Sequence, residues 1–373
     1  MVAPVSAILG VMERLAPRSL AQEWDRERVG LSIGSPEAMV QKVMVALDPT
    51  QQVIEEALAA GAGLLITHHP FLFRPLSAIR TDQPAGRAIA RALAGGLALF
   101  SAHTNLDAVE GGVSSVLAER LGLHDVEPLE AEGEPLLKLA VFVPESHVEA
   151  VREALGRAGA GQLGHYSHCT FGTNGTGTFL PGEGSQPFIG WPGVLERVAE
   201  VRLETILPER LLNKVLAAML KAHPYEEPAY DVYPLRNRGQ LSGLGRIGRL
   251  PAPVSLGEMV GRVKRALDVT HVAYLGDPGA TIEKAAVCGG SAGDLVARAA
   301  FRGANLFVAG EVKYHEGLSA AESGLAVIAA GHDATERLVV PALAQRLREE
   351  FERLRLDLEV LEERTKPVLW QLG

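Results

Sequence analysis

Two adjacent histidines, His68 and His69, follow directly on an apolar stretch in the segment GLLITHHPFLF. Polar groups at the end of a buried strand are costly unless they find partners, so two imidazoles in this place need an explanation. Three further groups follow other apolar stretches: Asp107 in SAHTNLDA, and His332 and Glu336 in GHDATE. One metal ion takes three or four imidazole or carboxylate ligands, and a pair of ions takes more. A lone histidine is more often structural, but these groups together predict a metal site.

The elements that must bring these residues together follow an α/β pattern. Apolar runs at 41–47 and 62–67 flank a helical pattern at 49–61, and the C-terminal third repeats the scheme. All candidate ligands stand at the ends of predicted strands, and such ends meet at one crevice of an open α/β sheet. Segments 96–107 and 324–336 both begin Gly-Leu-Ala and both carry a histidine four residues before a carboxylate. The sequence therefore predicts a duplicated α/β domain with mixed or parallel sheets.

The middle of the chain has a different pattern. Apolar alternation, helical spacing and turn residues predict the order β-α-β-β-α-β, with Asn174-Gly175 expected to turn between two short strands. This order is typical of a ferredoxin-like α+β domain. We therefore expect an inserted domain at residues 136–236 and a discontinuous parent domain at residues 1–135 and 237–373.

Composition narrows the function classes. A net charge of −9 and a pI near 5.7 argue against a broad nucleic-acid-binding surface. Cys169 and Cys288 form no CxxC pair, which argues against a disulfide framework and against a thiolate zinc site. No apolar run reaches the roughly 20 residues that a membrane span needs, and no secretion signal precedes the first helix. These features predict a cytoplasmic protein without membrane contact.

Four segments, LLITHHPFLF, SAHTNLDA, GEVKYHE and GHDATE, resemble the signature segments of the Nif-three-like family, whose members are also described as GTP cyclohydrolase I type-two homologues. The segment HPYEEPAYDVYPL resembles the copper-tolerance-A/PII-like domain that a bacterial subgroup carries as an insertion. The sequence departs from the family pattern at WDRERVGL, which has two extra residues, at Ala309-Gly310-Glu311 and at Asp333. None of these departures removes a ligand, but each could alter the pocket wall.

The resemblance implies a dinuclear metal centre with two divalent ions per subunit, in a homo-oligomer that forms a toroidal hexamer. The ligands it implies are His68, His69, Asp107, His332 and Glu336. His103 stays open as a neighbour that orients Asp107 or a bound water. Imidazole and carboxylate together suit zinc, iron, manganese, nickel or cobalt, so the ligand types do not select the metal.

Glu311 and His315 are spaced four residues apart, which would place them on one side of a helical turn. They are either general acid and base beside a metal-activated water or an ordinary charged helix start. The turn 289–294 offers backbone amides that could hold a phosphate, although a glycine-rich turn alone is weak evidence. Two functions remain. The first is a metal-dependent hydrolase that acts on a small nucleotide-like substrate, and the family resemblance suggests GTP cyclohydrolase-type ring opening as its reaction. The second is a metal-handling or regulatory protein whose insert senses a ligand or partner.

Overall fold

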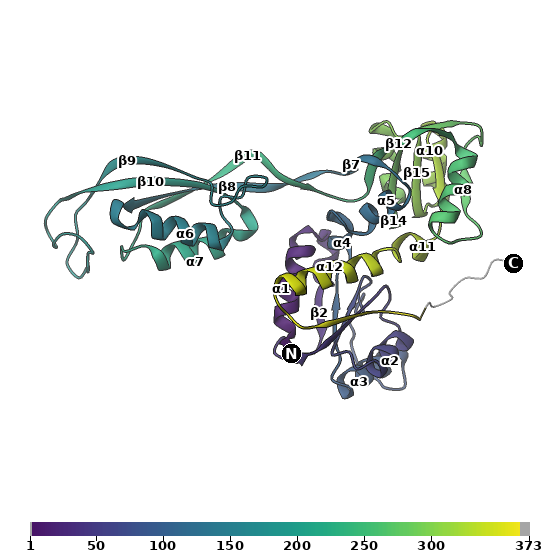
Figure 1. The fold of residues 1–373 in the computed structure, drawn as a ribbon, viewed down its shortest axis with the longest axis horizontal. Helices are drawn as coiled ribbons and strands as arrows, with labels where there is room; N and C mark the ends of the chain where they lie inside the picture. Colours follow the sequence, from purple (N-terminus) through teal and green to yellow (C-terminus); the bar gives the residue numbers. More distant parts are fainter. Residues whose placement is uncertain (1, 366–373) are drawn as a thin grey trace. The chain divides into compact units, whose positions relative to one another are not determined.

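The computed structural model describes residues 2–365, and its contacts divide the chain into two compact units. The first unit is Met1–Ala131 with Ser242–Gly373, and the second is Glu132–Leu241. Both are drawn in Figure 1, and each is described here by itself. The domain bounds expected from the sequence, 136 and 236, fall inside the second unit.

The first unit contains two sheets, of which one has the strand order β17-β4-β5-β6-β2. Strands β17, β4, β5 and β6 run parallel, and β2 pairs antiparallel with β6. The strands are β2 (Gly30–Ile33), β4 (Lys42–Ala46), β5 (Leu64–Thr67), β6 (Ala98–Ser101) and β17 (Glu359–Glu362). A short ribbon of β1 (Ala3–Pro4) and β3 (Met39–Val40) accompanies this sheet.

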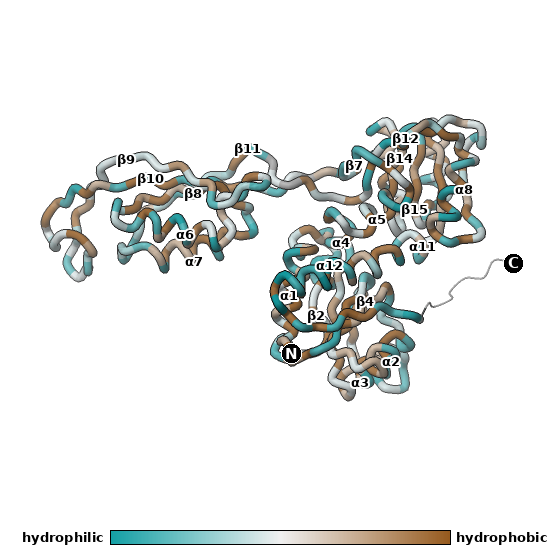
Figure 2. The backbone as a smooth tube through the Cα atoms, viewed as in Figure 1, coloured by the Kyte–Doolittle hydropathy of each residue, from teal (hydrophilic) through white to brown (hydrophobic). Residues whose placement is uncertain are grey.

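Helices cover both faces of this sheet, because alternate residues of each buried strand point to opposite sides. In β4, Val43 and Val45 pack with α1 and α12, whereas Met44 and Ala46 pack with α2 and α3. The helices of this half are α1 (Val5–Leu15), α2 (Gln51–Ala59), α3 (Pro84–Ala94), α4 (Thr104–Ala108), α5 (Val113–Arg120) and α12 (Val339–Arg353). The residues of β4 and β5 therefore read as continuous apolar runs, drawn brown in Figure 2.

The other sheet has the order β13-β16-β15-β14-β12-β7 and is covered in the same way. Strands β14, β15 and β16 are parallel, and antiparallel neighbours flank them. The strands are β7 (His124–Pro128), β12 (Arg246–Ser255), β13 (Ala273–Leu275), β14 (Thr281–Ser291), β15 (Leu306–Glu311) and β16 (Ala326–Ala329). The helices are α8 (Leu256–Ala266), α9 (Val296–Phe301), α10 (Tyr314–Glu322) and α11 (His332–Glu336).

The two halves of the first unit share one arrangement. Strands β4, β5 and β6 are three successive parallel strands, as are β14, β15 and β16. The last strand of each set leads into a short helix, α4 after β6 and α11 after β16. Each short helix carries a carboxylate of the predicted metal site, Asp107 or Glu336.

The second unit is one four-stranded sheet, β11-β8-β10-β9, with two helices on one face. Its elements are β8 (Glu132–Pro144), α6 (Val148–Ala158), β9 (Thr170–Phe179), β10 (Glu196–Pro208), α7 (Leu212–Ala222) and β11 (Tyr230–Ser242). The expected turn at Asn174-Gly175 is wrong, because β9 continues through both residues and pairs with β10 along its whole length. The other face of the sheet carries polar side chains such as Arg202 and Glu204, which form an ion pair.

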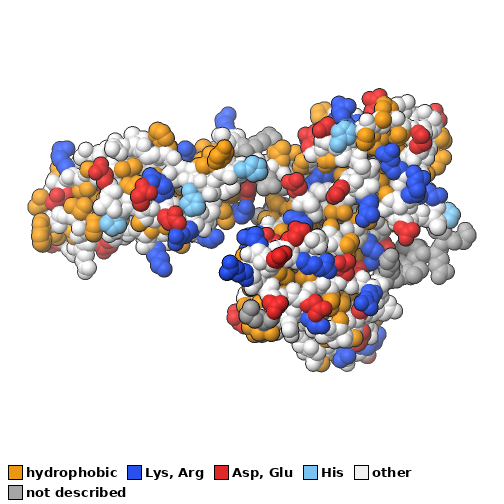
Figure 3. All heavy atoms as spheres, viewed as in Figure 1, with side chains coloured by type: hydrophobic (Ala, Val, Ile, Leu, Met, Phe, Trp, Pro, Cys, Tyr) orange, Lys and Arg blue, Asp and Glu red, His pale blue; other side chains and the backbone are white. Residues whose placement is uncertain are grey.

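Among the helices of residues 2–365, none is both long and apolar enough to cross a membrane. Acidic and basic side chains are interspersed over the face drawn in Figure 3. That face shows no continuous basic stripe of the kind that tracks a phosphate backbone.

Candidate metal centre

The end of β5 carries His68 and His69 into one cluster. The His68 amide donates to the Ala46 carbonyl at 3.2 Å and the His69 amide to the Leu47 carbonyl at 3.0 Å, so the chain stays extended beyond the strand. The two imidazole rings lie 5.1 Å apart between centroids. His68 is buried, with 1% of its surface exposed. The strand therefore delivers both imidazoles to the interior of the unit.

Two short helices supply the other groups. His103 immediately precedes α4, and the Asp107 amide donates to the His103 carbonyl at 3.1 Å. His332 is the first residue of α11 and Glu336 is the last. Residues four apart lie on the same side of a helix, and His332 Nε2 is 3.2 Å from Glu336 Oε2. The same local geometry thus presents an imidazole and a carboxylate in each half.

The Nε2 atoms of these histidines converge on the carboxylates. His68 Nε2 lies 3.7 Å from both Asp107 Oδ1 and Glu336 Oε1, and His69 Nε2 lies 3.0 Å from Glu336 Oε2. In two sets of three residues, each residue offers one nitrogen or oxygen atom that lies within 4.8 Å of those of the other two. We name them the imidazole triad, His68, His69 and His103, and the mixed triad, His69, His332 and Glu336. His69 belongs to both.

The opposite ring nitrogen of each histidine faces an oxygen atom. The Nδ1 partners are Ala102 O for His68 at 3.0 Å, Asp48 Oδ1 for His69 at 2.7 Å, Asp25 Oδ1 for His103 at 3.0 Å and Glu311 Oε2 for His332 at 3.5 Å. A carbonyl oxygen only accepts a hydrogen bond, so Nδ1 of His68 carries the proton and Nε2 offers a lone pair. Such outer partners fix the tautomer and orientation of metal-binding histidines.

Two buried atoms of this cluster have no hydrogen-bond partner: His68 Nε2 and Glu336 Oε2. Glu336 Oε2 is close to two imidazole nitrogens, but their directions are not those of hydrogen bonds. An unpaired buried polar atom costs about 1–3 kcal/mol, so two adjacent ones need a common partner. A cation between them would satisfy both, and nitrogen and oxygen donors are those that divalent transition metals bind. The residues present therefore fit a metal ion.

Gly290 leaves room beside the same groups. A Cβ atom at this position would lie 2.1 Å from Glu336 Oε1 and 3.2 Å from His332 Nε2. Its φ of +65° also favours glycine over other residues. The backbone of β14 consequently approaches the carboxylate as closely as a chain can.

Burial and charge shift the pKa values within the cluster. Burial raises the pKa of Asp107. Burial also acts to raise the pKa of Glu336, but His332, His68 and His69 outweigh it and hold that pKa well below its usual range. For His69, burial acts to lower the pKa, but the hydrogen bond to Asp48 and the adjacent Glu336 carboxylate overcome it and raise the pKa to about 10. The cluster thus attracts positive charge, and a metal ion would have to displace protons to bind.

Asp25 and Asp48 are site residues that the sequence reasoning missed. Asp25 is fully buried and accepts hydrogen bonds from Thr104 Oγ1 at 2.7 Å, from the Thr104 amide at 3.1 Å and from His103. Burial acts to raise the pKa of Asp25, but His103 and Thr104 outweigh it and lower that pKa. Their positions in the sequence could have indicated them, because Asp48 lies two residues after the end of strand β4 and Asp25 lies in the WDRERVGL segment.

The family profile described as Duf34/NIF3 (NGG1p interacting factor 3) matches residues 3–367. The chain belongs to this family. A relative from Halalkalibacterium halodurans, named GTP cyclohydrolase 1 type 2 homolog, is 46% identical over 355 residues, which are 95% of each chain. A Bacillus subtilis relative of the same name is 43% identical over 341 residues, 91% of each chain. The Nif-three-like resemblance read from the four motifs is confirmed.

Solved structures of similar proteins share the fold of this Duf34/NIF3 chain. A Bacillus cereus protein related to NIF3 is 41% identical, with a TM-score of 0.90 over 100% of this chain and 99% of that one. A Staphylococcus aureus protein, 24% identical, has a TM-score of 0.79 over the same shares of the two chains. The expected α/β fold with parallel and antiparallel strands is confirmed.

The structure brings Glu311 to the cluster but separates it from His315. Glu311 is the last residue of β15, its side chain is 58% exposed, and its Oε2 faces His332. His315 lies exposed in the first turn of α10, where its ring contacts Tyr314. The expected shared helical turn is wrong, because a strand end and a bend separate the two residues.

Two amides of the turn 289–294 already have partners. The Gly290 amide donates to Thr335 Oγ1 at 3.1 Å and the Ala292 amide to the Glu311 carbonyl at 3.4 Å. The turn therefore supports α11 and the end of β15, and these two amides are not free to hold a phosphate.

An aromatic rim lies beside the imidazole triad. The rings of Trp24 and Phe73 lie 5.9 and 6.4 Å from that of His103, and both side chains are substantially exposed. The Arg28 guanidinium stands over both rings, 5.4 Å from Trp24 and 5.0 Å from Phe73, and donates to the Phe73 carbonyl at 2.8 Å. The rim offers flat apolar surfaces and one positive charge next to the cluster.

Proposed function

We propose that this protein is a metal-dependent hydrolase whose centre holds two divalent ions. The proposed ligands are His68, His69, Asp107, His332 and Glu336. The observation that carries the proposal is the convergence of Nε2 atoms whose Nδ1 atoms are each held by an oxygen. His103 shares this arrangement, so we add it as a further ligand candidate.

The proposed chemistry is hydrolysis. Bound divalent ions lower the pKa of water toward neutrality and polarise the bond to be cleaved. The donor set suits zinc, iron, manganese, nickel or cobalt. The chain's own contribution is to orient the imidazoles, through Asp25, Asp48 and Glu311, and to exclude bulk water from a largely buried cluster.

Glu311 is the proposed proton-transfer group. Its carboxylate is exposed, lies 3.5 Å from His332 Nδ1 and is not a member of either triad. A carboxylate in this position can exchange protons with solvent while it stays beside the reacting groups. The part predicted for His315 stays a prediction, since its ring lies away from Glu311 on α10.

The proposed substrate is a small nucleotide-like heterocycle. Trp24 and Phe73 offer surfaces on which a planar ring can stack, and Arg28 offers a charge that can pair with an anionic substituent. The name of the two relatives, GTP cyclohydrolase 1 type 2 homolog, is consistent with ring opening of a purine nucleotide as the reaction to test first.

We further propose that the two halves of the first unit arose by duplication and that residues 136–236 form a ferredoxin-like domain of the copper-tolerance-A/PII-like kind, inserted between residues 1–135 and 237–373. The shared strand order of the halves and the order β11-β8-β10-β9 of the second unit support these assignments. A toroidal hexamer is the proposed assembly. Light scattering coupled to gel filtration tests it, and a monomer or dimer at micromolar concentration would contradict it.

The decisive experiment compares Glu311→Gln with the wild type and with Glu322→Gln, which changes an exposed carboxylate on α10 away from the cluster. For each protein, bound metal is measured by mass spectrometry and turnover is measured with guanosine nucleotides and related metabolites. With metal supplied in excess, Glu311→Gln should stay loaded with metal and keep its assembly but lose about 10²–10⁴-fold in rate, the usual contribution of a positioned acid or base.

The rival function is metal handling, in which the same ligands store, deliver or sense metal. A carrier has no proton-transfer step, so Glu311→Gln should then leave metal transfer to a chelating acceptor intact. Absence of turnover in the wild type, together with efficient transfer, would overturn the hydrolase. Turnover that disappears in Glu311→Gln while both ions stay bound would exclude the carrier.

A further inference from the structure

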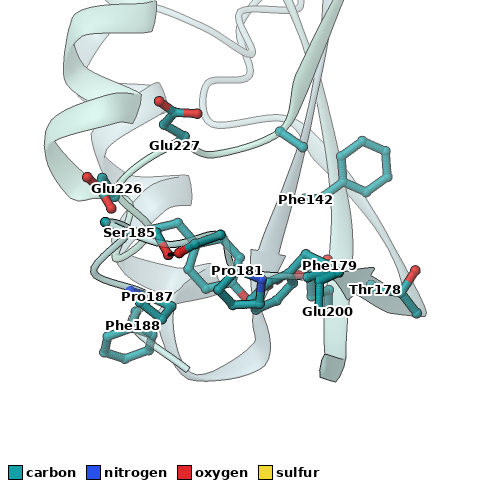
Figure 4. A pocket seen from close by; sticks show the side chains of 16 residues that line it. Phe142, Thr178, Phe179, Pro181, Ser185, Pro187, Phe188, Glu200, Glu226 and Glu227 are labelled. Carbon is teal, nitrogen blue, oxygen red and sulfur yellow. Dashed lines mark hydrogen bonds between the residues drawn. The ribbon is translucent and has the colours of Figure 1, made fainter. Parts of the chain in front are cut away.

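The second unit carries an open cavity of roughly 710 Å³, and none of its lining residues belongs to the metal centre. Its walls come from β9 and β10, from the segment 180–188 and from the segment 225–229 after α7. Figure 4 shows the side chains that line it, with Glu200 beside Phe179 and Pro181. All lining residues belong to Glu132–Leu241, so the cavity is complete within one unit.

A buried carboxylate lies at the wall of this cavity. Glu200 is 7% exposed, and its Oε1 accepts a hydrogen bond from the Tyr225 hydroxyl at 2.8 Å. Among the described residues, no Lys, Arg or His forms an ion pair with it. Burying a charge without an opposite charge is costly, and one hydroxyl compensates only in part. A cation bound beside this carboxylate would therefore stabilise it.

The chain keeps this carboxylate in place. On the neighbouring strand, a Cβ atom at Gly177 would lie 2.1 Å from Glu200 Oε2, so only glycine leaves room for it. The nearest positive side chain of the same strand face is Arg202, which pairs instead with Glu204 at 3.1 Å. Glu204 also pairs with Lys138 at 3.2 Å. The charges of these three surface residues are matched, whereas that of Glu200 is not.

His223, which lies close to Glu200, does not supply the missing charge. Its Nδ1 accepts a hydrogen bond from the Tyr225 amide at 3.1 Å, so Nε2 carries the proton and donates to the Phe142 carbonyl at 3.0 Å. An imidazole that accepts at one nitrogen and donates at the other is neutral. Burial chiefly lowers its pKa, which agrees with that assignment.

Aromatic rings and further carboxylates complete the lining. The Tyr225 ring lies 5.7 Å from that of Phe179 and 6.4 Å from that of Phe188. Glu226 and Glu227 stand at the cavity, and Glu226 accepts a hydrogen bond from the Gln186 amide at 3.0 Å, which joins two walls. None of the lining residues, all within the described chain, is Lys, Arg or His. Ring faces and carboxylates attract cations and repel phosphates and carboxylic acids.

We propose that this cavity binds a small organic cation, a protonated amine or guanidinium carried on an aromatic or apolar body. The cationic group pairs with Glu200 and the body contacts the rings of Phe179, Phe188 and Tyr225. This assignment is independent of the metal centre, and it separates the cavity from sites that hold nucleotide phosphates.

The test uses three probes of the same ring and length that differ in charge: tyramine, which is cationic, tyrosol, which is neutral, and 4-hydroxyphenylacetate, which is anionic. Binding to the full chain is measured by calorimetry. Tyramine should bind saturably and at least about tenfold more tightly than tyrosol, because a hydrogen bond to a charged group contributes about that factor. The anion should bind most weakly.

Two matched variants locate the binding. Glu200→Gln keeps the size of the side chain and removes its charge, so the preference for tyramine over tyrosol should disappear. Glu204→Gln removes a carboxylate of the same strand outside the cavity and should keep the preference. His69→Ala, in the metal centre, should also keep the preference for tyramine. The binding result can therefore be interpreted even if the metal assignment fails.

The proposal would be overturned by no saturable binding of tyramine, by equal binding of the three probes, or by equal loss of preference in Glu200→Gln and Glu204→Gln. If Glu200→Gln does not fold, as judged by its melting curve, the charge series on the wild type still decides, together with Glu226→Gln at the rim. A preference for the anion would refute the assignment with the wild type alone.

Discussion

Asp48→Asn isolates the electrostatic part of metal binding from ligand geometry. Asp48 Oδ1 lies 2.7 Å from His69 Nδ1, and its side chain is 25% exposed. Asparagine keeps an acceptor oxygen of the same size, so the ring should keep its orientation and lose only the neighbouring charge. Loss of such an outer partner typically lowers metal affinity by about 10–100-fold, or about 1.4–2.7 kcal/mol.

A second effect of Asp48→Asn opposes the first. Asp48 helps to raise the pKa of His69 to about 10, so at neutral pH a proton competes with the metal for this ring. Removing the carboxylate lowers that pKa, so the proton competes less strongly with the metal ion for His69. The loss of affinity should therefore be smaller at about pH 7 than at about pH 9, where fewer protons compete.

The assay is competition with a chromogenic chelator at both pH values, for one metal at a time. Asp82→Asn is the control, because Asp82 is exposed and pairs with Arg80 far from the triads in sequence. His69 has one free ring nitrogen, Nε2, so the affinity for the ion that this nitrogen binds should fall. Unchanged affinity for both ions would refute the role of Asp48, and a loss that grows toward neutral pH would refute the proton-competition argument.

Further predictions concern metal content, the insert and pH. The wild type should hold about two ions per chain, and His69→Ala and Glu336→Ala should each lose most of them by mass spectrometry; full retention in both would remove the site assignment. Replacing 136–236 with a Gly/Ser linker should leave a folded, metal-binding protein, because Leu129 and Glu130 bond Gly245 and Leu244 at the point where the chain leaves and returns. Insoluble product with several linker lengths would contradict this. Because burial chiefly depresses the pKa of His223, its contribution to stability is present above about pH 6.5 and falls as the pH drops. Hydrogen exchange of α7, divided by the intrinsic exchange rate at each pH, should therefore accelerate between about pH 7 and 5, and less so in His223→Gln. Equal acceleration in both proteins would assign the effect to other groups.

The sequence was sufficient to place the candidate ligands at the ends of strands. His68 and His69 follow an apolar run of strand length, and a β-α-β pattern makes that run a buried parallel strand. Parallel strands of one sheet end at a common edge, so His68, His69 and Asp107 could be expected to meet without knowledge of any distance. Glu336 follows β16 of the other sheet, so its approach to them does not follow from a shared strand edge. The prediction that strand-end residues meet thus rested on the topology of the parallel sheet.

What depends on single contacts could not be predicted. Asp25 and Asp48 are lone carboxylates in sequence and acquire their role only when His103 and His69 fold against them. The four-residue spacing of Glu311 and His315 resembles a helical turn, but the strand β15 extends to Glu311. Asn174-Gly175 has the composition of a hairpin turn, yet pairing with the long strand β10 outweighs that local preference.

The two triads have different formal charge and different softness. Three neutral imidazoles form one, whereas the other replaces an imidazole with the anionic oxygen of Glu336. Nitrogen-rich sites favour the later first-row metals, and a carboxylate oxygen raises the relative affinity for manganese and ferrous iron. A chain that meets a mixture of ions would therefore favour different metals at the two triads. Because His69 offers one free ring nitrogen to both triads, the ion that takes it would influence what the other triad can hold.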